Sequence, residues 1–66
     1  MAKRYLDAIL SRRAGGWNLD SADGERFLDK CENMSNIQVL DFLRATENWE
    51  LVTVYDNDIF FLRKEY

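Results

Sequence analysis

Helical spacing of apolar residues characterises the first half of the chain. In residues 2–13, five apolar side chains recur at intervals of three and four, which places them along one side of a helix. They are Ala2, Tyr5, Leu6, Ile9 and Leu10. Gly15 and Gly16 follow this segment and are typical of a helix end. The pattern predicts a first amphipathic helix over residues 2–13.

A second group of apolar positions follows at the same kind of spacing. It comprises Phe27, Leu28, Cys31 and Met34, with Gly24 on the same face. Asp20 or Ser21 can cap a helix that begins here, because a side-chain oxygen accepts a hydrogen bond from an unpaired N–H of the first turn. The pattern predicts a second helix over residues 21–32.

The third predicted helix has the clearest start signal. Ser35 and Gln38 have the spacing of a capping box, in which each side chain bonds the backbone N–H of the other residue. Behind it, a broad apolar arc is formed by Val39, Leu40, Phe42 and Leu43. We predict a helix over residues 35–46, ended by Asn48 in a left-handed conformation.

The last third of the chain has the composition of β-strands. Residues 49–55 and 59–64 are rich in Val, Tyr, Thr, Ile and Phe, and a polar run, residues 56–58, separates them. This arrangement predicts an antiparallel hairpin. A two-residue turn at Asp56 and Asn57 would pair Glu50 with Arg63, Leu51 with Leu62, and Val52 with Phe61. The register stays open, because residues 59–62 are apolar on both faces.

These elements together predict one α+β domain over residues 1–66, with three short helices followed by a C-terminal antiparallel β-hairpin. The order of helix, short extended segment, helix, three-residue turn at residues 33–35, helix and hairpin resembles a winged helix-turn-helix. In that arrangement the second helix of the pair enters the major groove and the hairpin forms the wing. The resemblance is one of element order, and no family motif accompanies it.

Composition argues against catalysis. The chain has no histidine, so the usual proton shuttle at neutral pH and the commonest transition-metal ligand are missing. Cys31 falls within an apolar stripe and is predicted to be a buried thiol. The acidic run at residues 20–25 lacks the spacing of a calcium loop. We expect no catalytic residue, cofactor or metal site, and an enzyme that uses carboxylates alone is the least favoured alternative.

A single cysteine rules out an intrachain disulfide, the usual stabiliser of small secreted domains, and therefore favours a cytoplasmic location. No apolar run approaches the ~18 residues that a membrane span needs. No signal peptide is visible, because the first ten residues are amphipathic. We expect no association with a membrane.

Large aromatic side chains are more numerous than so small a core readily encloses. Five are predicted contact residues: Trp17, Trp49, Tyr55, Phe60 and Tyr66. The alternative, that they build the core of an undersized domain, stays open. The apolar strand at residues 59–62 would also permit strand pairing if it lay at a sheet edge. We expect a small non-catalytic regulatory protein that acts through a protein partner or homodimer.

Nucleic-acid binding is the second hypothesis. A winged-helix regulator would use Gln38 and Arg44 on the third helix, with Arg12 and Arg13 at the end of the first. The net charge of −3 and the acidic turn at residues 56–58 disfavour it, because phosphate contacts require a basic surface.

Overall fold

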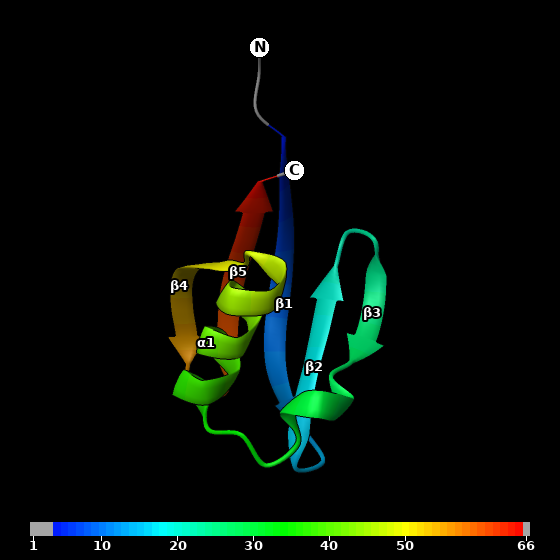
Figure 1. Ribbon diagram of the computed structural model, residues 1–66, viewed down its shortest axis with the longest axis vertical. Coiled ribbons are helices and arrows are strands. Elements are labelled where there is room, and N and C mark those ends of the chain that lie inside the picture. Colours follow the sequence, from blue (N-terminus) through cyan, green and yellow to red (C-terminus); the bar gives the residue numbers. More distant parts are fainter. Residues whose placement is uncertain (1–3, 66) are drawn as a thin grey trace.

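The computed structural model describes residues 4–65, which form a five-stranded antiparallel sheet with one α-helix across one face (Figure 1). In chain order the elements are β1 (Tyr5–Arg13), β2 (Gly16–Ser21), β3 (Gly24–Phe27), the 3-10 turn η1 (Asp29–Cys31), α1 (Asn36–Glu47), β4 (Glu50–Asp56) and β5 (Ile59–Glu65). The strand order is β3-β2-β1-β5-β4. The predicted architecture of three helices and a hairpin is therefore wrong. A helix-turn-helix needs two α-helices, and the described residues contain one, α1. The winged-helix-like order is therefore wrong as well.

The predicted first helix is instead β1, the central strand of the sheet. It pairs with β2 on one side and with β5 on the other. Ala8 and Leu10 alternate inward and are buried, whereas Tyr5 and Ile9 lie on the opposite face and are exposed. Apolar residues on both faces of a strand reproduce the spacing of an amphipathic helix. Pairing with β2 and β5 makes this segment a strand, and the local periodicity of the sequence does not reveal that pairing.

The glycines that were expected to end that helix belong to a hairpin turn. Arg13 pairs with Gly16, and the two residues between them have positive φ, 47° at Ala14 and 80° at Gly15. Positive φ at both central residues is the requirement of a type I′ turn, whose twist matches that of the flanking strands.

The predicted second helix is also wrong, because its residues are divided between β2, β3 and η1. Ser21 pairs with Gly24, and the Ser21 hydroxyl donates a hydrogen bond to the Gly24 carbonyl oxygen at 3.2 Å. Gly24 has φ of 134°, which L side chains rarely adopt. Short polar residues and glycine serve turns as well as helix caps, so the same signals favoured both structures.

The third predicted helix is confirmed as α1. Ser35 and Gln38 form the expected capping box, and Asn48 ends the helix with φ of 61° and ψ of 26°. These signals are local, and they work without help from distant residues.

The predicted hairpin is confirmed as β4 and β5. Near its base, Glu50 pairs with Arg63 and Leu51 with Leu62, as the two-residue turn at Asp56 and Asn57 would place them. The pairing then shifts between Leu51 and Thr53 and again between Val54 and Asp56. Phe61 consequently pairs with Thr53 and not with Val52, and the two turn residues are Asn57 and Asp58. Two β-bulges of this kind twist β4 more strongly than a regular strand.

The core lies between α1 and the sheet face that it covers. Its buried members are Ala8, Leu10, Trp17, Leu19, Leu28, Cys31, Val39, Leu43, Trp49, Phe60 and Leu62. The indole N–H of Trp17 donates to the Met34 carbonyl oxygen at 3.0 Å, which ties β2 to the segment before α1. Within residues 4–65, no helix is long and apolar enough to cross a membrane.

Candidate functional site

The most distinctive surface is the outer edge of β4. This strand is last in the sheet order, so β5 takes its inner backbone edge and no other described strand pairs with its outer one. All seven of its residues are exposed. Four are large and apolar: Leu51 (48% exposed), Val52 (55%), Val54 (54%) and Tyr55 (69%). A long apolar strand with an unpaired backbone edge is a template for pairing with another chain.

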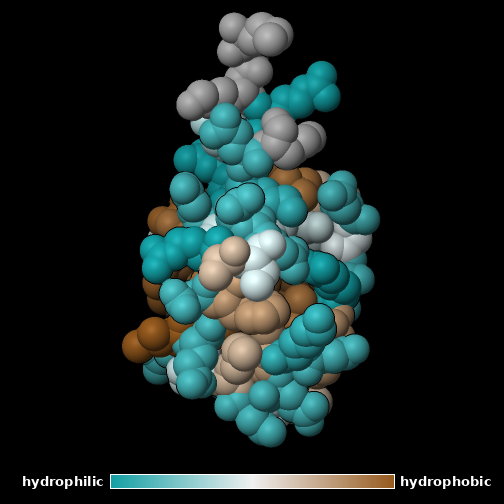
Figure 2. All heavy atoms as spheres, viewed as in Figure 1, coloured by the Kyte–Doolittle hydropathy of each residue, from teal (hydrophilic) through white to brown (hydrophobic). Residues whose placement is uncertain are grey.

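A groove runs between α1 and β4. Its volume is about 380 Å³, and its apolar lining consists of Ile37, Leu40, Trp49, Leu51 and Leu62. Ile37 is 75% exposed on the helix side. Asp41 and Arg44 form an ion pair at 3.6 Å on the same side. Hydrophobic side chains show along the left margin of Figure 2, the side on which Figure 1 places β4.

The ends of β4 are negatively charged. Neither Glu50 nor Asp56 forms an ion pair with another described residue, although Asp56 accepts a hydrogen bond from the backbone N–H of Asn57 at 2.5 Å. In the adjoining turn, Asp58 is paired with Arg12 at 3.0 Å. The apolar strand is therefore flanked by two carboxylates that form no direct ion pair with a described residue, and Glu50 stands opposite Arg63 of β5.

The structure divides the predicted contact residues. Trp17, Trp49 and Phe60 are buried in the core, where a partner cannot reach them. Tyr55 is exposed, and its ring lies 4.8 Å from that of Phe61. Tyr66 lies outside the described residues. Most of the aromatic surplus therefore builds the core, as the alternative interpretation held.

The apolar run at residues 59–62 has a different position from the one considered. It belongs to β5, which lies between β1 and β4 and has no free edge. Its residues are apolar on both faces because Phe60 and Leu62 face the core while Ile59 and Phe61 face the uncovered side. Of the exposed apolar β4 residues, only Tyr55 was among the predicted contact residues. Leu51, Val52 and Val54 were missed because their strand could be assigned from sequence but its place in the sheet could not.

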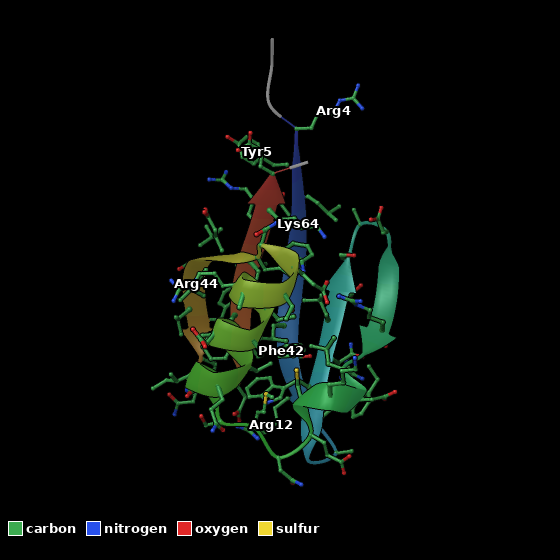
Figure 3. All side chains as sticks on the ribbon, viewed as in Figure 1. Arg4, Tyr5, Arg12, Phe42, Arg44 and Lys64 are labelled. Atoms are coloured by element: carbon green, nitrogen blue, oxygen red, sulfur yellow. The ribbon has the colours of Figure 1, made fainter. Side chains whose placement is uncertain are left out.

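The four residues of the nucleic-acid hypothesis do not form one basic surface. Gln38 accepts a hydrogen bond from the backbone N–H of Ser35 at 2.9 Å, and Arg44 is paired with Asp41. Figure 3 shows Arg44 beside β4 and Arg12 near the turn that follows β1. Arg12 is paired with Asp58, and Arg13 is exposed at the end of β1.

Cys31 is buried, as predicted. Burial is the main cause that raises the pKa of its thiol above the ordinary value of 9.0, and the charge of Glu47 acts in the same direction while Arg26 opposes both. A neutral thiol with no solvent access is a weak nucleophile. Within the described part of the chain, no three His, Cys, Asp or Glu residues lie together as a metal site would require.

Comparisons with known protein families, with curated proteins and with solved structures found no match for this chain. A function must therefore be derived from the geometry and chemistry of its own residues. The outer edge of β4 and the groove beside it are the features that offer one.

Proposed function

We propose that this chain is a small non-catalytic binding protein that acts by contact with another protein. The contact is made by the β4 surface, which we define as Leu51, Val52, Val54 and Tyr55 together with Ile37 of α1. One observation carries the proposal: the four β4 side chains are about half exposed or more beside an unpaired strand edge. Leu51 shares the α1-side groove with the exposed Ile37, and Tyr55 lies beside Phe61. Contiguous exposed apolar groups mark interaction sites more often than they mark neutral surface.

The chemistry of the chain supports a role without bond-making. It has no histidine, and its one cysteine is buried with a raised pKa. The grooves offer carboxylates beside arginines, an arrangement that favours ion pairing over proton transfer. A cytoplasmic location and a regulatory role stay predictions.

Nucleic acid is a weaker alternative. Its helix-turn-helix framework is missing, two of its four residues are engaged in ion pairs, and the net charge is −3. Binding to a protein requires neither a helix-turn-helix framework nor a basic surface.

Capture from native lysate on the immobilised protein tests the proposal. A Val52→Ser/Tyr55→Ser variant removes two β4 side chains, and Tyr5→Ser is the matched control because Tyr5 is 47% exposed on the uncovered face. We expect a stoichiometric protein partner that survives nuclease treatment, is retained by the control and is lost by the β4 variant. Equal capture by all three proteins, or a partner that nuclease removes, would contradict the proposal.

A further inference from the structure

The β4 edge and the α1–β4 groove lie side by side and suit one mode of binding. An extended segment placed along β4 can exchange backbone hydrogen bonds with its unpaired edge. Side chains alternate between the two faces of a strand, so every second residue of that segment would face the side on which α1 lies. There the groove offers Leu40, Leu51 and the exposed Ile37 as apolar contacts. Backbone pairing supplies affinity in such an arrangement, and the groove selects side chains.

The charges at the two ends of β4 narrow the choice of segment. Glu50 and Asp56 begin and end the strand, and both carboxylates lack an ion-pair partner among the described residues. A segment with a Lys or Arg at each end and apolar residues between them would complement both the charge and the apolar middle of β4. At about 3.3 Å per residue, seven residues match the length of the strand.

The same charges disfavour a second copy of this chain as the occupant. In a symmetric antiparallel pair centred on Thr53, Glu50 of one copy stands opposite Asp56 of the other at both ends of the contact. Like charges directly opposite one another destabilise a sheet. The two bulges of β4 would also have to match a second bulged strand, whereas a flexible segment can follow their twist.

We infer that the partner contributes an extended, basic-flanked apolar segment that joins the sheet as a sixth strand beside β4. This inference rests on the proposed function, since it specifies which part of a protein partner the β4 surface takes.

A designed peptide tests the inference directly. The probe is the capped heptapeptide Lys-Thr-Val-Thr-Val-Thr-Lys, titrated into ¹⁵N-labelled protein at low salt while amide chemical shifts are recorded. We expect saturable shifts in β4 and along the groove, at Ile37 and Arg44, with a dissociation constant below about 1 mM. No saturable change up to that concentration, or changes centred on the uncovered face around Tyr5 and Ile9, would overturn the inference.

Two control peptides separate the contributions of backbone and charge. The peptide N-methylated at all five residues between the lysines cannot donate backbone hydrogen bonds from that stretch to either side, and we expect it not to bind. The peptide with Glu at both ends should bind more weakly, because it meets Glu50 and Asp56 with like charge. Equal binding by either control would refute strand addition or charge selection, respectively.

A variant of the protein provides the matching control. Glu50→Gln/Asp56→Asn keeps the size of both side chains and an oxygen at position 56 to accept the Asn57 N–H. We expect its affinity for the Lys-ended peptide to fall roughly 2- to 10-fold, with little change for a peptide ended by Gln. An unchanged preference for Lys would remove the role of these carboxylates.

Failure of the inference differs from failure of the proposed function. If lysate capture depends on Val52 and Tyr55 but no peptide binds β4, a protein contact exists without strand addition. If capture is insensitive to the β4 variant, the proposed function itself is lost. A stable dimer in sedimentation that disappears in the β4 variant would identify a second copy as the occupant and overturn the inference.

Discussion

The two edges of this sheet differ in length, composition and protection. β3 has four residues, among them Glu25 and Arg26, and the Arg26 guanidinium is hydrogen-bonded to Glu47 at the end of α1. β4 has seven residues, all of them exposed, and four of the seven are large and apolar. A short, charged edge is a common way in which proteins prevent unwanted pairing. At the β4 edge, the features that disfavour unwanted pairing are the two bulges and the carboxylates at the ends of the strand.

The difference teaches that the two edges expose apolar surface unequally: β4 exposes four large apolar side chains, whereas β3 exposes one, Phe27. The core already contains Trp17, Trp49 and Phe60, so the chain had large side chains available to fill its interior. The apolar residues of β4 make little contribution to that interior. They give β4 an apolar edge that can pair with another strand, whereas the short, charged β3 edge is less suited to pairing. We therefore expect that changes on β4 affect binding, whereas changes next to β3 affect stability.

The largest effect should come from Trp17, on the strand beside β3. Trp17→Ala removes a fully buried ring and its hydrogen bond to Met34, and we expect the free energy of unfolding to fall by about 3–5 kcal/mol. Tyr55→Ala on β4 should change it by about 0.5 kcal/mol or less. Urea denaturation measures the free energy of unfolding of both variants. Similar losses would contradict the claim that β4 contributes little to stability.

Neutral ends should make β4 more prone to self-pairing. In Glu50→Gln/Asp56→Asn the like charges that oppose two-fold pairing are gone, and we expect the self-association constant to rise roughly 2- to 10-fold. Glu25→Gln in β3 is the control and should change nothing. Sedimentation equilibrium at high protein concentration measures the effect. A rise in the control as well would mean that net charge, and not the β4 edge, limits association.

A smaller effect is expected at the β3 edge. Arg26→Gln removes the ion pair with Glu47, whose two side chains are 50% and 26% exposed. We expect a loss of stability of about 0.2–1 kcal/mol, because solvent screens a pair of this kind. Amide exchange should become faster in β3 and stay unchanged in β4. Faster exchange in β4 alone would show that this pair does not secure the β3 edge.

The smallest effect concerns Cys31 and appears only at alkaline pH. Its pKa is raised in the folded state above 9.0, so below that pH both states carry the proton and the thiol adds no pH dependence. Above it the unfolded chain loses the proton first, and stability falls as pH rises. The decline from pH 9 upward should be shallower in Cys31→Ala. Identical slopes in urea titrations would contradict a raised pKa.

Local signals were sufficient for α1 and for the existence of the hairpin. The Ser35–Gln38 capping box and the left-handed Asn48 specify the helix within its own segment. The β4–β5 pairing needs only a short turn between two strand-like runs. Both are short-range structures, for which the sequence carries the necessary information in one place.

Non-local pairing decided the rest of the fold. Residues 5–13 carry apolar side chains at positions that suit a helix and a strand alike, and the pairs Leu10–Leu19 and Ile9–Phe61 settle the question. The second partner lies about fifty residues away along the chain, beyond the reach of any periodicity. Prediction of the candidate site was limited in the same way. Aromatic residues can be counted from sequence, but only the strand order separates buried Phe60 from exposed Tyr55.

Residue-resolved amide hydrogen exchange of the native protein tests the central claim, an unpaired outer edge on β4. The account predicts slow exchange at residues 8–11 of β1, where β2 pairs on one side and β5 on the other, and slow exchange in β4 only for amides bonded to β5. The other β4 amides should exchange rapidly. Uniform protection along β4 in the isolated chain would show that its edge is already covered, and would contradict the account.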